Sequence, residues 1–163
     1  MTDRFAVVGA GQMGNGIAHV CATTGFDVTL IDVSADALAK AKATIDKNLD
    51  RQVKKGALDE AAKAAAMARI ATATSLDAVK GATVIVEAAT ERKELKLQIF
   101  RDLDAKADAG AILATNTSSI SITEIAAVTK RPESVIGMHF MNPVPVMQLV
   151  EVIRGLATSD AVN

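Results

Sequence analysis

The sequence predicts an α/β fold, a doubly wound and mainly parallel sheet with an inserted helical hairpin. Three observations point to it. Short runs rich in β-branched residues alternate with helical segments from the N-terminus onward, which is typical of parallel sheets with crossover helices. The first such run ends in a glycine-rich turn that opens a helix. Two consecutive helical segments at residues 35–68 then interrupt the alternation as a hairpin.

Hydrophobic periodicity places the individual elements along the chain. A strand at 5–8 is followed by a helix that ends at Gly25 and by a second strand at 27–32. Strand, helix and strand within about thirty residues form a βαβ unit with a parallel, right-handed crossover. Ser34 is the expected N-cap of a helix over 35–55. Further strands are expected at 70–73, 84–88, 111–115, 134–140 and 148–153, and further helices at 59–68, 92–108 and 123–128.

The composition excludes several classes of protein. Half of the 163 residues are hydrophobic and the formal net charge is -1, which favours one folded domain over a disordered chain. The balanced charge and only four aromatic residues, all Phe, argue against a nucleic-acid partner. The single cysteine excludes an internal disulfide and a multi-thiolate metal site. With neither a targeting segment nor a long apolar stretch, we expect a cytoplasmic protein that binds no membrane.

The segment Gly-Ala-Gly-Gln-Met-Gly at residues 9–14 fits the dinucleotide fingerprint G-x-G-x-x-G. It follows a strand and opens a helix within a βαβ unit, which is the context that the fingerprint requires. Gly9 would permit the tight turn, Gly11 would let a pyrophosphate approach the backbone, and Gly14 would allow close helix–strand packing. Gln12 and Met13 lie at the helix N-terminus, where the anion would bind.

Asp32 ends the second strand about twenty residues after the fingerprint. A carboxylate at this position accepts hydrogen bonds from the adenosine ribose hydroxyls and repels a 2′-phosphate. Val33 and Ser34 follow it, with no arginine to bind that phosphate. The sequence therefore predicts NAD rather than NADP as the cofactor. The alternative is an ordinary glycine-rich turn with a solvated carboxylate at the strand end.

Only two histidines are available as a base that titrates near neutral pH. His19 falls on the first helix, where we expect it to be partly exposed. His139 ends a strand just before an Asn-Pro-Val-Pro loop, at the sheet edge where open α/β sheets bind ligands. Glu151 and His139 are each six residues from Pro145, so a symmetric hairpin would place them opposite each other. Alternatively, His139 is a strand-end residue with a structural role and Glu151 a surface residue.

Two polar segments have open interpretations. Asn116-Thr117-Ser118-Ser119 follows a strand, and its hydroxyls could donate to a substrate oxygen or simply form turns and caps. The helix over 35–55 carries a basic excess, with Lys54 and Lys55 beside its end. This run is either a solvated face or a contact for the phosphates of a large anionic substrate.

Several motifs occur along the chain in a fixed order. They are the glycine loop at 9–16 with Asp32, Val-Ile-Val-Glu-Ala-Ala-Thr-Glu at 84–91, Asn-Thr-Ser-Ser at 116–119, His-Phe-Met-Asn-Pro-Val-Pro at 139–145 and Leu-Val-Glu-Val at 149–152. With these motifs the chain resembles, from about residue 4 to residue 156, the short-chain 3-hydroxyacyl-CoA dehydrogenases, particularly bacterial 3-hydroxybutyryl-CoA dehydrogenases.

The resemblance implies oxidation of the C3 hydroxyl of an acyl-CoA, with hydride passing to NAD, and the reverse reduction. On this mapping His139 is the general base and Glu151 orients its imidazole. Ser118 hydrogen-bonds the C3 oxygen, and Asn142 lines the substrate pocket.

The same resemblance assigns the remaining binding residues. Glu91 and Lys96 match positions near the nicotinamide and its ribose, and Asn116 is placed with the cofactor. Lys54 and Lys55 fall in the helical hairpin that contacts the CoA moiety in the family, and Ser118 is also assigned to the CoA substrate.

The chain departs from the family in two respects. Met141 stands where a second Phe is common. The family's chain continues into an all-helical C-terminal domain, so we expect residues 1–156 to be the NAD-binding domain and 157–163 the start of a truncated segment. Such a chain should bind NAD but turn over weakly or not at all. It should expose apolar surface near its last strand, whereas the full-length protein should be a homodimer.

Two other functions stay open at this stage. One is a non-catalytic NAD-binding module whose site residues are relics. The other is a different hydroxy-acid dehydrogenase of the Rossmann type that uses a lysine base, against which the His139–Pro143 segment argues.

Overall fold

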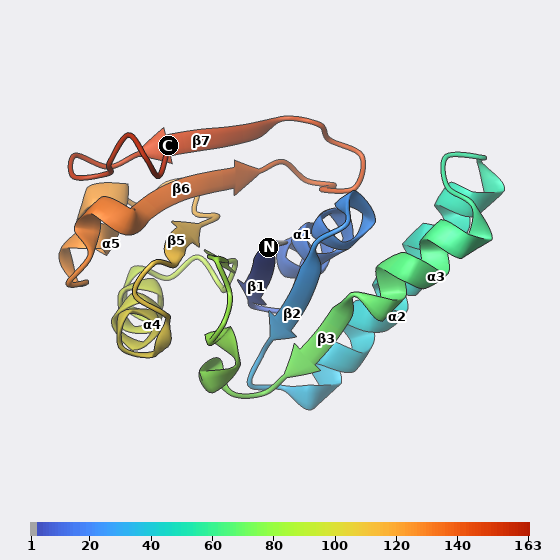
Figure 1. Cartoon of the computed structure of the whole chain (residues 1–163), viewed down its shortest axis with the longest axis horizontal. Coiled ribbons are helices and arrows are strands. Elements are labelled where there is room, and N and C mark those ends of the chain that lie inside the picture. The colour runs from blue at the N-terminus through green and yellow to red at the C-terminus, as the bar shows by residue number, and fades with distance from the viewer. Residues whose placement is uncertain (1–2) are drawn as a thin grey trace.

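The computed structural model describes residues 3–163, which form one seven-stranded sheet with helices on both faces (Figure 1). In chain order the elements are β1 (Arg4–Val8), α1 (Gln12–Thr24), β2 (Asp27–Ile31), α2 (Ala35–Lys54), α3 (Glu60–Ala68), β3 (Ile70–Ala73), the 3₁₀ helix η1 (Leu76–Val79), β4 (Val84–Glu87), α4 (Lys93–Lys106), β5 (Ile112–Thr115), α5 (Ile122–Ala127), the 3₁₀ helix η2 (Pro132–Ser134), β6 (Val135–Phe140) and β7 (Val150–Arg154).

The strand order β3-β2-β1-β4-β5-β6-β7 is that of a doubly wound sheet. Neighbouring strands are parallel throughout, except that β7 runs antiparallel to β6. Since the chain order reverses between β1 and β4, the crevice at the carboxyl ends of these two strands is the place where such sheets bind ligands. The predicted fold class is therefore confirmed.

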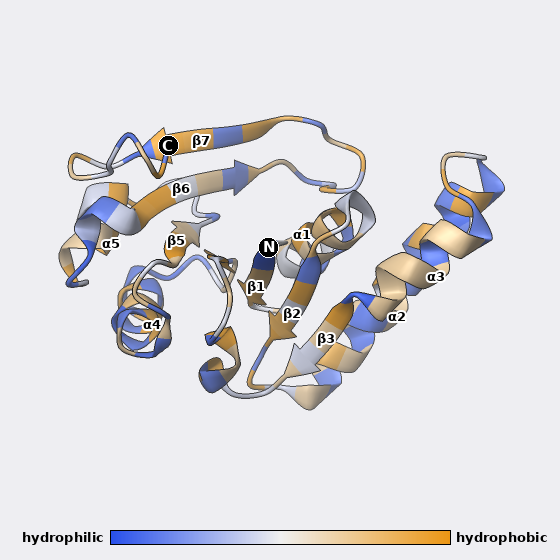
Figure 2. Ribbon diagram, in the orientation of Figure 1, coloured by the Kyte–Doolittle hydropathy of each residue, from blue (hydrophilic) through white to orange (hydrophobic). Residues whose placement is uncertain are grey.

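Alternate residues of the central strands pack into two separate cores. In β1, Val7 faces the core formed with α1, α2 and α3, while Ala6 and Val8 face the core formed with α4 and α5. This alternation is the period-two geometry of a strand buried on both faces. Figure 2 shows the hydrophobic residues gathered on the central strands.

The predicted helical hairpin over residues 35–68 is present and projects from one side of the sheet (Figure 1). The Ser34 hydroxyl accepts a hydrogen bond from the Ala37 amide at 3.1 Å, and the Asp59 carboxylate caps α3 through the Ala62 amide at 2.7 Å. These caps satisfy amides that the first turn of each helix leaves without partners. The buried face of α2 consists of Leu38, Ala41, Ile45 and Leu49.

The last strand begins later than predicted. We expected it at 148–153, whereas β7 spans Val150–Arg154. The chain turns at Pro143, whose carbonyl accepts hydrogen bonds from the Val146 and Met147 amides at 3.0 Å, and pairing with β6 starts only after this turn. None of the helices within residues 3–163 is long and apolar enough to cross a membrane.

Candidate active site

The glycine loop between β1 and α1 has the geometry that its sequence predicts. Gly9 has a φ of +107°, and a Cβ atom there would lie 2.6 Å from the Ala88 carbonyl oxygen. A Cβ atom on Gly14 would lie 1.7 Å from the Gly9 carbonyl oxygen, so both positions require glycine. In contrast, a Cβ atom on Gly11 would meet none of the atoms of residues 3–163 outside its own immediate chain neighbourhood within 4 Å. The space in front of Gly11 is open, directly at the N-terminus of α1.

A cavity of about 570 Å³ lies over the carboxyl ends of β1, β2 and β4. Its lining includes Gly9, Ala10 and Gly11 of the glycine loop and Asp32 at the end of β2. Apolar side chains form much of its remaining wall, among them Ile31, Val33, Leu76, Leu95 and Ile99.

The Asp32 carboxylate is held in place at this cavity by backbone amides. Its Oδ2 accepts a hydrogen bond from the Ala10 amide at 2.9 Å, and its Oδ1 accepts one from the Ser34 amide at 2.9 Å. A carboxylate oxygen can accept more than one hydrogen bond, so both oxygens can still receive ribose hydroxyls. A dinucleotide fits these residues, because the open space at Gly11, the helix N-terminus and the oriented carboxylate supply its usual binding groups.

His139 and Glu151 lie directly opposite each other in the antiparallel pair β6 and β7. Their predicted opposition is confirmed, and His139 Nδ1 lies 3.3 Å from Glu151 Oε2. The side chain of His139 is 22% exposed and that of Glu151 is 49% exposed. The imidazole is therefore accessible to a ligand while one of its nitrogens is paired with a carboxylate.

Asn116 ties the segment of His139 to the strand ends beside the cavity. Its backbone N–H donates a hydrogen bond to the Glu87 carbonyl at 2.8 Å, and its side-chain Oδ1 accepts one from the Phe140 backbone N–H at 2.8 Å. One residue thus connects the carboxyl ends of β4, β5 and β6. The cavity-lining residue Ala88 directly follows Glu87.

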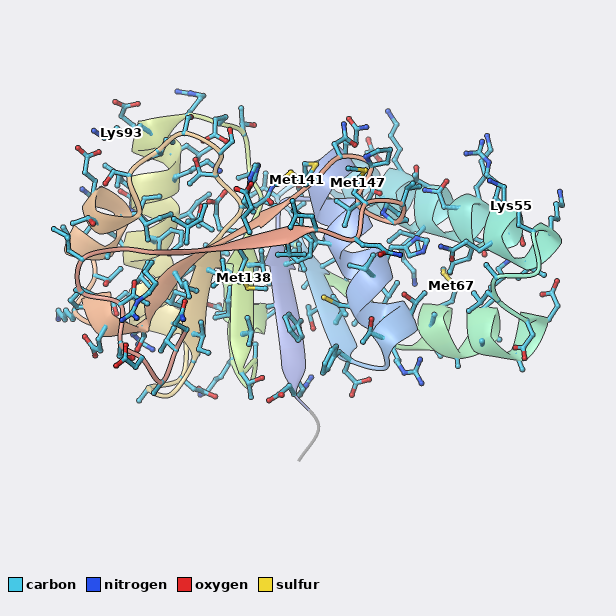
Figure 3. All side chains as sticks on the ribbon, turned by 90° about the horizontal axis from the view of Figure 1, so that it is seen from above. Lys55, Met67, Lys93, Met138, Met141 and Met147 are labelled. Carbon is cyan, nitrogen blue, oxygen red and sulfur yellow. The ribbon has the colours of Figure 1, made fainter. Side chains whose placement is uncertain are left out.

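A second bridge joins the proline-rich loop to the glycine loop. Gln12 Nε2 donates to Asn142 Oδ1 at 3.2 Å, across 130 residues of sequence. Gly16 makes the close approach possible, because a Cβ atom there would lie 2.7 Å from Val144 Cβ. The neighbouring residue Met141 is labelled near the centre of Figure 3. Gly16 lies outside the fingerprint, and only this contact reveals its role.

The Asn-Thr-Ser-Ser segment combines a buried and an exposed hydroxyl. Thr117 is buried; its hydroxyl bonds to the Glu91 carboxylate and accepts a hydrogen bond from the Ile120 amide at 3.1 Å. Ser118 is exposed. Thr117 therefore has the capping role that such residues often have, whereas the Ser118 hydroxyl is accessible to a ligand.

Lys96 is buried in an ion pair that the sequence reasoning missed. Its side chain is 1% exposed, and its Nζ donates to Glu87 Oε2 at 2.7 Å and to the Ala89 carbonyl at 3.2 Å. The fully buried Glu87 also accepts hydrogen bonds from the Ala89 amide at 2.7 Å and from the Thr115 hydroxyl at 2.8 Å. A glutamate that ends an otherwise apolar strand was the signal for this network.

The two remaining cationic candidates lie away from the cavity. Lys54 and Lys55 are exposed at the outer end of the hairpin, and Figure 3 shows Lys55 far from Met141. Any contact of Lys54 or Lys55 with a ligand is therefore distant from the glycine loop.

The expectation of a partly exposed His19 is wrong. Its side chain is 1% exposed, because α2 packs against α1, and His19 Nε2 lies 3.2 Å from Gln52 Oε1. Burial lowers the pKa of His19 below its ordinary value, so the neutral ring is the stable form here. His19 is a core residue of the helical layer.

Comparison with known proteins identifies the family. The model of the family described as "3-hydroxyacyl-CoA dehydrogenase, NAD binding domain" matches residues 4–163. A 3-hydroxybutyryl-CoA dehydrogenase of Bradyrhizobium diazoefficiens is 56% identical over 158 residues, which cover 97% of this chain and 54% of that protein. A probable 3-hydroxybutyryl-CoA dehydrogenase of Bacillus subtilis is 49% identical over 96% of this chain and 55% of its own length.

Solved structures agree with this identification. The crystal structure of (S)-3-hydroxybutyryl-CoA dehydrogenase from Ralstonia eutropha superposes with a TM-score of 0.97 at 51% identity, over 99% of this chain and 57% of that one. The chain thus spans about half the length of the curated relatives that it matches. It belongs to the 3-hydroxyacyl-CoA dehydrogenase family and comprises that family's NAD-binding domain.

Proposed function

We propose that this chain serves the NAD-dependent oxidation of a 3-hydroxyacyl-CoA to the 3-ketoacyl-CoA, and the reverse reduction, with 3-hydroxybutyryl-CoA as the reference substrate. The observation that carries the proposal is the His139–Glu151 pair at 3.3 Å. His139 lies on β6, which Asn116 ties to the end of β4 beside the cavity. The relatives that are named 3-hydroxybutyryl-CoA dehydrogenases support this choice of substrate.

The residues around the cavity would hold the cofactor. Backbone amides of the segment from Gly11 to Met13 would bind the pyrophosphate at the N-terminus of α1. The Asp32 carboxylate would accept the ribose hydroxyls of the adenosine. Glu91, Lys96 and Asn116 would lie at the nicotinamide end. When bound, NAD supplies the hydride acceptor, and the protein supplies position and charge.

His139 would hold the proton that leaves the C3 hydroxyl. When Nδ1–H donates to Glu151, the lone pair of Nε2 is available to accept that proton. The Glu151 carboxylate then stabilises the imidazolium cation that forms, as the carboxylate does in a catalytic triad. Ser118 would donate a hydrogen bond to the C3 oxygen, and Asn142 would line the acyl pocket.

The domain organisation and setting are further parts of the proposal. Residues 1–156 would form the NAD-binding domain, with 35–68 as its hairpin, and 157–163 would begin the next segment. Lys54 and Lys55 would contact the CoA moiety, and the complete enzyme would be a cytoplasmic homodimer. Because the relatives are almost twice as long, we propose that this chain alone binds NAD but turns over slowly or not at all.

Substitution of His139 tests the proposed chemistry. In a chain extended to the length of the relatives, His139→Ala should lower NADH consumption with acetoacetyl-CoA by about 10²-fold or more, while NADH affinity stays nearly unchanged. Glu133→Gln, which changes an exposed carboxylate of η2 just before β6, is the control and should retain full activity. Unchanged turnover in His139→Ala would exclude this residue as the base and revive a lysine-based dehydrogenase.

Comparison of the two chain lengths tests the second part. The 163-residue chain should bind NADH but consume it far more slowly than the extended chain. Equal turnover of the two chains would contradict the proposal that the acyl pocket needs more protein. NADH binding without turnover in both chains would instead favour a non-catalytic NAD-binding module.

A further inference from the structure

We infer that Asp102 and Gln98 of α4 make the cofactor cavity selective for adenine, by accepting a hydrogen bond from the 6-amino group of the base. The inference rests on the binding of the dinucleotide in the cavity above the glycine loop. Leu95, Gln98, Ile99 and Asp102 all line that cavity, and their spacing of three and four residues places them on one face of the helix. A single face of α4 therefore forms a continuous wall of the site.

The cavity-lining face of α4 carries apolar side chains near the start of the helix and ends in the polar Asp102. Leu95 lies in the first turn of α4, beside the carboxyl ends of the strands, and Asp102 lies two turns further on. The apolar side chains Leu95 and Ile99 face the same cavity as Val33 and Leu76, so they provide surfaces for a flat, largely apolar base. Asp32 lines the same cavity and is placed for the ribose. Gln98 and Asp102 of α4 would then face the edge of the base.

The polar pair presents hydrogen-bond acceptors. Gln98 Nε2 donates to Asp102 Oδ1 at 3.0 Å, which orients both side chains. Within residues 3–163 no other group donates to the Asp102 carboxylate, so Oδ2 retains its full capacity to accept. Lys106, one turn further along α4, is paired with Asp77 and leaves the charge of Asp102 in place. Gln98 keeps its carbonyl oxygen as an acceptor and its second N–H as a donor, so the acceptor that discriminates between bases is the Asp102 carboxylate.

Acceptors select a base by its donors. The 6-amino group of adenine donates two hydrogen bonds, whereas hypoxanthine carries a 6-oxo group that only accepts and would face the carboxylate unfavourably. A hydrogen bond to a charged group is stronger than a neutral one, and an unmatched polar contact costs affinity. We expect NADH to bind at least about tenfold more tightly than its hypoxanthine analogue, since tenfold corresponds to about 1.4 kcal/mol.

Fluorescence titration of the 163-residue chain with NADH and with reduced nicotinamide hypoxanthine dinucleotide tests the inference. The chain has no Trp and no Tyr, so protein fluorescence does not disturb the nicotinamide signal. Asp102→Asn keeps the shape but replaces an acceptor with a group that can donate, so the preference for NADH should fall to within about twofold or reverse. Glu94→Gln removes a carboxylate from the same helix outside the cavity and should keep the wild-type ratio.

Each result decides the question. A tenfold preference that Asp102→Asn abolishes and Glu94→Gln retains supports the inference, with circular dichroism showing that both variants are folded. Equal binding of the two dinucleotides to the wild type, or a preference that Asp102→Asn leaves intact, overturns it while NAD binding itself stands. Failure of both dinucleotides to bind removes the cofactor assignment and the inference with it.

Discussion

Substitution of Glu87 tests whether the buried ion pair beneath the site stabilises the domain. Glu87 is fully buried, and Lys96 is 1% exposed. Glu87→Gln keeps the shape of the side chain but leaves the Lys96 ammonium without a counter-charge. Loss of one partner from a buried pair typically costs about 3–5 kcal/mol. For a domain whose total stability is about 5–15 kcal/mol, this is a large fraction.

The same free energy can be expressed as a melting temperature. At about 2–4 °C per kcal/mol for a chain of this size, Glu87→Gln should lower the midpoint by roughly 6–20 °C. Urea and thermal unfolding should be followed by far-UV circular dichroism, because the chain has no Trp. The double variant Glu87→Gln/Lys96→Met removes both charges, so it should lose less stability than the sum of the two single variants.

An exposed ion pair provides the control. Lys106 pairs with Asp77, and their side chains are 40% and 74% exposed, so Lys106→Met should leave the unfolding free energy almost unchanged. The reasoning would be refuted if Glu87→Gln were as stable as Lys106→Met, or if the single losses simply added in the double variant. Either result would mean that burial does not make the Lys96–Glu87 pair interdependent.

Three further predictions follow from the fold. Gly11→Ala should keep the melting temperature but weaken NADH binding in fluorescence titrations. Gly14→Ala should lower both the melting temperature and the NADH affinity, because of the two added Cβ atoms only that of Gly14 meets the protein backbone. Unchanged NADH affinity in Gly11→Ala would contradict the assignment of the open space to the cofactor. Because burial lowers the pKa of His19 from its ordinary 6.5, the unfolded state binds more protons, so unfolding free energies should fall as the pH drops below about 6.5. His19→Gln should flatten that part of the profile, and an identical slope in both proteins would show that His19 is not its source. Leu149 and Val152 are 58% and 54% exposed beside the sheet edge. The chain should therefore self-associate in sedimentation experiments, and Val152→Glu should reduce the self-association. A single species at every concentration would rule out self-association.

Much of the site was predictable because its chemistry is local. The turn at Gly9 and the cap at Ser34 depend on residues within a few positions of one another. The opposition of His139 and Glu151 also followed from their equal distance from Pro145. In each case the spacing along the chain sets the geometry.

The α/β alternation, the dinucleotide loop and the opposition of His139 and Glu151 could be predicted from residue order and spacing. In contrast, the burial of Lys96 against Glu87, the core position of His19 and the packing of Val144 on Gly16 became apparent only from the folded chain. The packing of the hairpin also leaves Lys54 and Lys55 exposed at its outer end. The physical reason is that burial and approach depend on how separate elements pack. A helix or strand carries the pattern of its own faces, but the partner that covers each face is set by the assembled sheet.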